Sequence, residues 1–248
     1  MKPFLILQLR PETEASDDEY AAFLNKGGLA ASDTRRIRLD REDLPKNLDL
    51  QQFSGVIVGG GPGCVSDPED EKSPVERRIE AAVLGLMPEI TAADFPFMGC
   101  CYGIGILAHH LSATVSKARY GEPVGVTHCQ ITSARVADDP MLHGLPAAFS
   151  AFVGHKEAVQ ALPEGCAHLL KSDACPYQMI RHGRNVYATQ FHPEADSQGF
   201  ALRIRIYKDR GYFPPEDAAR LTRLCHDEPV EMPSRILGNF VRRYGRDS

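Results

Sequence analysis

The segment Gly99-Cys100-Cys101-Tyr102-Gly103 constrains the fold more than any other part of this sequence. It follows a short apolar run at residues 95–98, which is typical of a buried strand. It precedes residues 104–111, whose apolar composition predicts a buried helix. A sharp turn between a strand and a helix is where α/β enzymes place an exposed nucleophile.

The spacing of the glycines favours Cys101 over Cys100 as that nucleophile. Such a turn tolerates only small residues two positions before and two positions after the reactive side chain. Gly99 and Gly103 hold those positions for Cys101, whereas the same positions relative to Cys100 hold two large residues. The N-terminus of the following helix is expected to lower the pKa of the Cys101 thiol.

Strand-like and helix-like segments alternate through the first half of the chain. Apolar strands are predicted at 4–7 and 53–58, with helices at 17–29 and 75–86. This alternation predicts an α/β fold with a mostly parallel sheet and helices on both faces. From 114 onwards β-branched residues recur, so the second half is expected to be β-rich and partly antiparallel.

The character of the chain changes after Glu194. We expect residues 1–195 to form the catalytic domain. Residues 196–233 are charged and rich in proline, and we interpret them as an inserted helical appendage serving as a lid, a dimer contact or a partner-docking surface. Residues 234–248 contain an amphipathic pattern and are expected to form a C-terminal helix that packs on the main domain.

Composition excludes several classes of function. The 248 residues carry a net charge of −5, which argues against nucleic acid or an anionic membrane as a partner. No apolar run is long enough to span a bilayer and no secretory signal is recognisable. The seven cysteines contain no Cys-x-x-Cys pair, which fits reduced thiols in the cytoplasm and predicts no metal site.

A catalytic thiol needs a base, and His192 is the strongest candidate. It lies in Phe191-His192-Pro193-Glu194, directly after a predicted strand. Two residues apart in extended chain, His192 and Glu194 project from the same face. Glu194 can therefore orient the imidazole while His192 faces the thiol.

The glycine run that follows the strand at 53–58 predicts an oxyanion hole. Its backbone N–H groups can approach a ligand closely because no side chains intervene. We expect the N–H groups of Gly61 and Tyr102 to stabilise the oxyanion. A phosphate-binding role is disfavoured because no Gly-Lys-Ser/Thr ending follows the glycines.

Together these three motifs resemble the class I (triad) glutamine amidotransferase family. The family combines a Gly-Gly-Pro loop, a Gly-x-Cys-x-Gly-x-Gln elbow and Phe-His-Pro-Glu in this order. The resemblance implies a flavodoxin-like sheet and a triad of Cys101, His192 and Glu194. It also implies conversion of glutamine to glutamate and ammonia through a γ-glutamyl thioester, a chemistry that needs no cofactor. Within the family the chain is similar to stand-alone domains related to the GMP synthetase amidotransferase.

The resemblance also implies substrate-binding residues, and here the sequence departs from the family. We expect Gly60, Gly105 and His155 to bind the substrate. Gly105 stands where the family has a glutamine that helps to hold the substrate, and residues 154–157 resemble its His-x-Asp stretch.

Three functions therefore stay open. The substrate is a small molecule, either glutamine or a γ-glutamyl peptide hydrolysed by the same triad. The third alternative is a non-catalytic binding or regulatory subunit. The sequence is compatible with a separate synthetase subunit as partner and with a homodimer.

Overall fold

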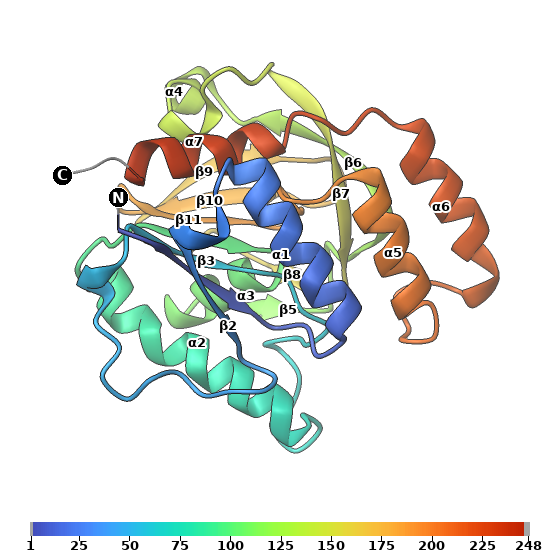
Figure 1. Ribbon diagram of the computed structural model, residues 1–248. Helices are drawn as coiled ribbons and strands as arrows, with labels where there is room; N and C mark the ends of the chain where they lie inside the picture. Colours follow the sequence, from blue (N-terminus) through green and yellow to red (C-terminus); the bar gives the residue numbers. More distant parts are fainter. Residues whose placement is uncertain (1, 246–248) are drawn as a thin grey trace.

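The computed structural model describes residues 2–245 (Figure 1). Residue 1 of the predicted catalytic domain and residues 246–248 of the predicted final segment lie outside that range. In the described part, nine strands form one sheet in the order β2-β1-β3-β4-β11-β10-β9-β6-β7. A further pair, β5 (Val115–Ser116) and β8 (Ala158–Val159), is antiparallel.

The sheet is parallel in one half and antiparallel in the other. The parallel half consists of β1 (Phe4–Gln8), β2 (Thr34–Arg38), β3 (Gly55–Val58), β4 (Phe97–Cys100) and β11 (Val186–Thr189). The antiparallel half consists of β10 (Met179–His182), β9 (Cys166–Lys171), β6 (Glu122–Ile131) and β7 (Ala148–His155). This arrangement confirms the predicted α/β class and the β-rich second half.

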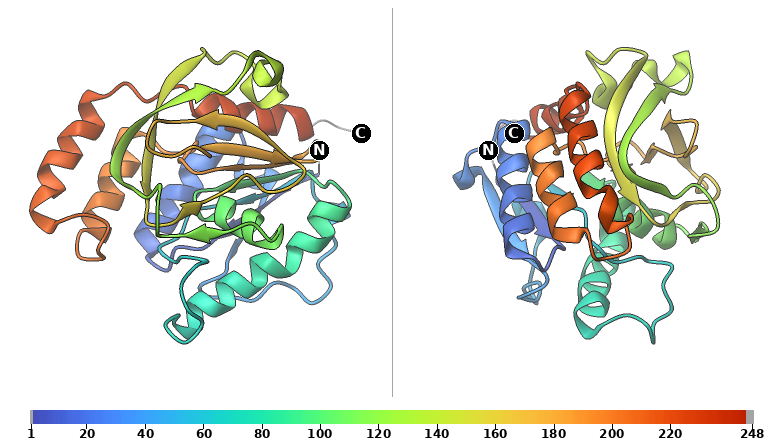
Figure 2. Two further views of the ribbon diagram at one scale, coloured as in Figure 1. Left: turned by 180° about the vertical axis from the view of Figure 1, so that it is seen from behind. Right: turned by 90° about the vertical axis from the view of Figure 1, so that its right-hand side faces the viewer.

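Helices cover both faces of the sheet (Figures 1 and 2). Along β1 alternate side chains enter different cores, because successive residues of a strand point to opposite faces. Phe4 and Ile6 pack in the core beneath α1 (Thr13–Gly27) and α7 (Ser234–Tyr244). Leu5 and Leu7 pack in the core beneath α2 (Pro74–Ala92) and α3 (Tyr102–His110).

Two helices of the segment 196–233 lie side by side at the end of the molecule away from α2 (Figure 1). They are α5 (Ser197–Tyr207) and α6 (Ala218–Asp227). Helix α5 packs against α1 and α6, and α6 packs against β6. A short α4 (Ala134–Ala137) lies in the connection between β6 and β7. No helix among residues 2–245 is long and apolar enough to cross a membrane.

The boundaries of α1, α2 and α3 differ from the predictions, and α2 continues to Ala92 instead of ending at residue 86. Helix α1 begins at Thr13 rather than at 17, so Ser16 is buried within its first turns. It ends at Gly27, and Gly28 caps it in the left-handed conformation with a φ of 66°. Helix α3 begins at Tyr102 rather than at 104, directly after the β4 turn.

The turn between β4 and α3 depends on Gly99. A Cβ atom on Gly99 would lie 2.9 Å from the Cα atom of Gly103, so the first turn of α3 packs directly on the Gly99 backbone. A Cβ on Gly103 would meet only Val58, at 3.9 Å. The requirement for a small residue is therefore strict at Gly99 and loose at Gly103.

We expect Gly99→Ala to destabilise the protein by about 1–3 kcal/mol, because backbone has to move to accept the methyl group. Urea unfolding followed by circular dichroism measures this change. Gly85→Ala in α2 is the matched control, since no atom lies within 4 Å of its added Cβ. The control should be neutral or stabilise by up to about 1 kcal/mol. Equal stabilities of the two variants would contradict this account of the turn.

Candidate active site

The ends of four parallel strands bring the predicted site residues to one edge of the sheet. The segments that follow β1, β3, β4 and β11 all emerge there, as expected for neighbouring parallel strands. The Cys101 N–H donates to the carbonyl of Thr189 at 2.8 Å, which ties the turn after β4 to the end of β11. The segment carrying His192 begins immediately beyond that bond.

Cys101 adopts a backbone conformation that is rare for a residue with a side chain. Its φ is 56° and its ψ is −89°. Such a conformation costs free energy and persists only where the surrounding structure enforces it. It places Cys101 at the N-terminus of α3, with Tyr102 as the first helical residue.

A contact with Glu194 fixes the orientation of His192. The Nδ1 atom of His192 lies 2.9 Å from Oε1 of Glu194, and both residues are buried. Because a carboxylate only accepts, Nδ1 carries the proton and Nε2 keeps its lone pair. The backbone N–H of His192 also donates to the carbonyl of Phe152 at 3.1 Å.

The charges around His192 keep it neutral. Burial lowers the pKa of His192, and the guanidinium groups of Arg203 and Arg10 lower it further against the opposing effect of Glu194. Burial alone would raise the pKa of Glu194, but His192 and Arg203 hold it well below its usual range. Glu194 is therefore ionised while His192 is an uncharged imidazole near neutral pH.

The environment of the Cys101 thiol differs from the prediction. Burial raises the pKa of Cys101 to about 12, although Arg10 acts in the opposite direction. Desolvation therefore outweighs the favourable electrostatics that were expected from the helix N-terminus. The resting thiol is protonated, and its activation requires a base.

Two N–H groups at the start of the glycine loop after β3 are engaged within the protein. The N–H of Gly59 donates to the carbonyl of Leu7, and that of Gly60 donates to Glu19. In the part of the chain that the structure describes, the N–H of Gly61 has no acceptor. Gly61 and Tyr102 line a cavity together with Cys101.

A buried ion pair supports this loop, and sequence reasoning missed it. Arg10 follows β1 and donates through Nε to Oε1 of Glu19 in α1 at 2.8 Å. A Cβ on Gly60 would lie 2.6 Å from Nη2 of Arg10 and 2.8 Å from Cε1 of His192. Gly60 thus gives Arg10 and His192 the room to approach. Arg10 could have been suspected because it follows a buried strand at the carboxyl edge.

Two small cavities adjoin the Cys101 side chain. One, of about 20 Å³, is also lined by Tyr102, Gly105, His155 and Glu157. The other, of about 30 Å³, is lined by residues that include His192, Arg10 and Arg203. Each holds about a water molecule. Tyr212 borders both cavities and donates its hydroxyl proton to the carbonyl of Pro62 at 3.0 Å.

A larger cavity lies beside the site rather than over the thiol. It has a volume of about 620 Å³ and reaches Gly61 and Tyr102, but Cys101 does not line it. Helix α2 contributes part of its wall, and the hydroxyl of Tyr102 donates to Glu80 of that helix at 2.7 Å. This contact anchors the first turn of α3.

Gly105 makes room for Glu157. A Cβ on Gly105 would lie 3.0 Å from Oε1 of Glu157. The two carboxylate oxygens of Glu157 accept hydrogen bonds from the N–H groups of Val65 at 2.9 Å and Ser66 at 2.8 Å. Glu157 therefore fills the space beside Gly105 and holds the end of the glycine loop.

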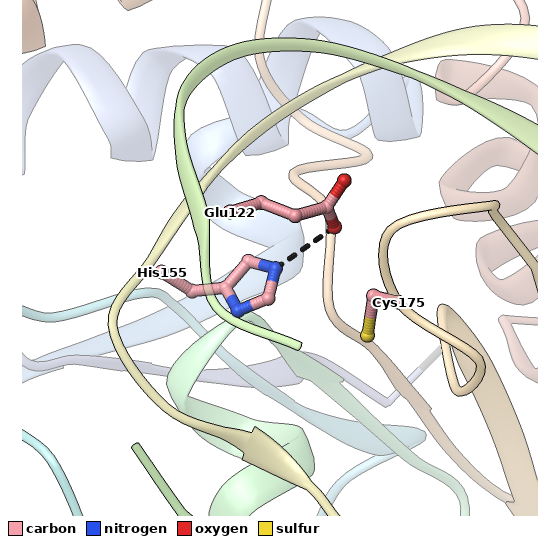
Figure 3. Close-up of side chains that lie close together, drawn as sticks. All are labelled: Glu122, His155 and Cys175. Atoms are coloured by element: carbon pink, nitrogen blue, oxygen red, sulfur yellow. Dashed lines mark hydrogen bonds and ion pairs between the residues drawn. The ribbon is translucent and has the colours of Figure 1, made fainter. Parts of the chain in front are cut away.

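His155 belongs to a buried polar cluster (Figure 3). Its Nδ1 atom donates to the carbonyl of Glu157 at 2.9 Å, and its Nε2 atom lies 3.0 Å from Oε2 of Glu122. Glu122 also accepts from Gln178 at 2.5 Å. Both ring nitrogens of His155 are thus engaged within the protein, and the cluster shapes the turn that carries Glu157.

The same cluster contains the one group among residues 2–245 that could hold a metal ion. The ligand atoms of Glu122, His155 and Cys175 all lie within 4.8 Å of one another. Burial raises the pKa of the Cys175 thiol to about 12. Because His155 and Glu122 already bond to each other, to Glu157 and to Gln178, we assign this cluster a structural role.

The structure thus brings together Cys101, His192 and Glu194, with Gly61 and Tyr102 beside the thiol. Gly105 and His155 line the smaller cavity, whereas Gly60 supports Arg10 and His192 from behind. Besides Arg10, sequence reasoning missed the buried charged residues Glu19 and Arg203. A buried charge inside a helix leaves no local sequence pattern from which it could have been found.

Comparisons with known proteins point to one family. The family model described as "Glutamine amidotransferase class-I" matches residues 30–204. The chain is 32% identical over 180 residues to the glutamine-hydrolysing GMP synthase of Lactobacillus delbrueckii subsp. bulgaricus, covering 69% of this chain and 32% of that protein. It is 26% identical over 156 residues to one subunit of the glutamine-hydrolysing GMP synthase of Archaeoglobus fulgidus, covering 62% of this chain and 74% of that protein. The chain therefore spans about a third of the length of the Lactobacillus relative.

Solved structures share the fold over nearly the whole chain. A glutamine amidotransferase from Thermotoga maritima matches with a TM-score of 0.77 and 20% identity, covering 100% of both chains. Another from Methylobacillus flagellatus matches with a TM-score of 0.71 and 18% identity, covering 100% of this chain and 97% of the other.

We expect His192→Ala to slow the alkylation of Cys101 by iodoacetamide by about 10²-fold at neutral pH, because the buried thiol depends on this base. Fragmentation mass spectrometry of the modified peptide measures the rate at Cys101 and separates it from Cys100. His109→Ala in α3 is the control, since His109 is exposed and lies away from the thiol. Equal alkylation rates in all three proteins would exclude His192 as the base.

The pH profile of the same reaction tests the charge state of His192. Because the pKa of His192 is lowered from its ordinary value of 6.5, the free base persists at pH values where an ordinary histidine is protonated. The fall of the alkylation rate of Cys101 toward acidic pH should therefore be centred below pH 6.5. A fall centred above pH 6.5 would contradict the described electrostatics.

Proposed function

The chain belongs to the class-I glutamine amidotransferase family, and on that premise we propose that it hydrolyses the side-chain amide of glutamine through a thioester on Cys101. One observation carries the proposal. Cys101 and His192 line the same cavity, and His192 is bonded through Nδ1 to Glu194. The free Nε2 atom is then the base that the protonated thiol requires.

The first half of the reaction forms the acyl-enzyme. His192 takes the proton of the Cys101 thiol as the sulfur attacks the amide carbon. The N–H groups of Gly61 and Tyr102 stabilise the resulting oxyanion. His192 then donates its proton to the departing nitrogen, and ammonia leaves a γ-glutamyl thioester on the sulfur.

The second half consumes water. His192 removes a proton from a water molecule, and the oxygen attacks the thioester carbon. Collapse of the oxyanion expels the sulfur, which regains its proton from His192. The products are glutamate and a free thiol, so atoms and charge balance over the cycle.

The cavity on the His192 side favours glutamine over a γ-glutamyl peptide. The leaving group departs toward His192, because this residue protonates it. That cavity measures about 30 Å³, which suits ammonia or water rather than an amino acid. A γ-glutamyl peptide would require α5 and Tyr212 to move away from the thiol.

Three of the predicted site residues have indirect roles in this proposal. Gly60 gives space to His192 and Arg10, while Gly105 gives space to Glu157. His155 holds the turn at residues 154–157 through its bonds to Glu122 and Glu157. Their contribution to substrate binding is to shape the wall of the cavity next to Cys101.

We expect the wild-type protein to release equimolar ammonia and glutamate from glutamine. Cys101→Ala should lower turnover by at least about 10³-fold, since the nucleophile is lost. Cys100→Ala is the matched control and should retain turnover within a few-fold, because Cys100 is a fully buried core residue. A coupled glutamate dehydrogenase assay measures the product, and circular dichroism verifies the fold.

The same assay distinguishes the alternatives. Release of an amino acid from γ-glutamyl dipeptides, without turnover of glutamine, would replace glutamine by a peptide as the substrate. No turnover of either substrate, together with no alkylation of Cys101 by a glutamine-like electrophile, would indicate a non-catalytic binding or regulatory subunit.

We propose in addition that the ammonia passes to a separate synthetase subunit. The support is the archaeal relative, whose name describes it as one subunit of a glutamine-hydrolysing GMP synthase. Affinity purification of the tagged chain from its native extract should recover a stoichiometric synthetase. Recovery of the chain alone under low-salt conditions would contradict this part of the proposal.

A further inference from the structure

Helix α5 places the buried guanidinium group of Arg203 beside the Glu194 carboxylate. Arg203 lies on α5 with only 5% of its surface exposed. Its Nη1 atom donates to Oε1 of Glu194 at 2.9 Å. The same oxygen accepts the proton of His192 Nδ1, also at 2.9 Å. One carboxylate oxygen thus joins the base to the helix of the segment 196–233.

We propose that Arg203 is a positioning residue of the hydrolysis proposed above, holding Glu194 in the orientation that presents His192 to Cys101. The proposal rests on the proposed function, because it assigns Arg203 to the machinery that activates the thiol. It makes α5 part of the active site rather than an outlying appendage.

Glu194 needs this partner because it is fully buried. A carboxylate removed from water is costly to ionise unless a cation or several hydrogen bonds compensate it. Its Oε2 atom has no hydrogen-bond partner among the described residues. Oε1 therefore carries the contacts to both His192 and Arg203, and loss of Arg203 would leave a neutral imidazole as its remaining side-chain partner.

Arg203 also acts on His192 directly. Its Nη1 atom lies 3.2 Å from Nδ1 of the imidazole. A guanidinium group is permanently positive and only donates hydrogen bonds. Its charge therefore disfavours the protonated, positively charged form of the ring. The charged groups facing His192 are Glu194 beside it in the chain, Arg203 from α5, and Arg10 after β1, which is itself paired with Glu19 from α1. The remaining titratable groups at this cavity are the Cys101 thiol after β4 and the phenol groups of Tyr207 and Tyr212.

Removal of the Arg203 charge should therefore raise the pKa of His192. The imidazolium loses a repulsive neighbour, and it gains a less compensated carboxylate beside it. Both changes raise the pKa of His192. The acidic limb of the rate profile should then move to higher pH, an effect that a merely structural anchor of α5 would not produce.

Arg203→Met tests the proposal, because methionine keeps much of the side-chain volume without charge or donors. We expect kcat for glutamine to fall by ~10²-fold, with KM changed less than about threefold. The acidic limb should move above its wild-type position. Arg203→Lys restores a single charged donor and should recover most of kcat and return the limb toward its wild-type pH.

Arg205→Met is the matched control on the same helix. The side chain of Arg205 is 63% exposed and pairs with Glu14 at the surface. This variant should keep the wild-type kcat and pH profile. An Arg203→Met protein with wild-type kcat and an unshifted limb would overturn the proposal, as would loss of activity with no shift of the limb.

If the Arg203→Met protein fails to fold, Arg203→Gln serves as the test variant. Glutamine keeps a neutral donor for Glu194, so the acidic limb should still move upward, whereas an unshifted limb overturns the proposal. The alkylation rate of Cys101 by iodoacetamide against pH provides a readout that is independent of glutamine. If the wild type does not turn over glutamine, the proposed function fails, and the alkylation profiles of the Arg203 variants still decide the role of Arg203.

Discussion

The parallel pairing of β4 with β11 is the constraint on which the site depends. Thr189 is in register with Cys100, and the bond from Cys101 N–H to the Thr189 carbonyl continues the ladder by one step. Two segments that are distant in sequence therefore leave the sheet at the same point. One carries the thiol on a strained backbone, and the other carries His192. A shift of this register by one residue would turn the side chains of β11 to the opposite face and separate the pair.

Burial of the site determines the protonation states of Cys101 and His192. In an exposed site, a helix N-terminus and two arginines would favour a thiolate. Here desolvation raises the pKa of Cys101 and lowers that of His192, so both groups rest in their neutral forms. In the hydrolysis that we propose, proton transfer from sulfur to imidazole is part of the reaction. The carboxylate of Glu194 stays ionised because His192 and Arg203 compensate its charge.

The sequence alone predicted the parts of the site that depend on local chain geometry. The elbow required Gly99 before Cys101, a pattern readable in a short window. The extended chain predicted at His192-Pro193-Glu194 is wrong, because these residues form a turn in which the Ala195 N–H donates to the His192 carbonyl at 3.3 Å. The predicted contact between His192 and Glu194 is made within that turn. The contacts of Arg203 with Glu194 and of Glu19 with Arg10 were not predictable, because each depends on how a helix folds back over the end of the strand that precedes it. Burial of the thiol was unpredictable for the same reason. The charge and prolines of residues 196–233 predict an appendage and give no sign that Arg203 and Tyr212 reach the edge of the site.

The most direct test of the account is the identity of the covalent intermediate. Protein mixed with glutamine and quenched in acid during steady-state turnover can be digested and mapped by mass spectrometry. The account predicts a γ-glutamyl group on the sulfur of Cys101, accumulating within the first turnover and disappearing when glutamine is exhausted. Turnover with no covalent adduct, or with the adduct on Cys64 or Cys100, would contradict it.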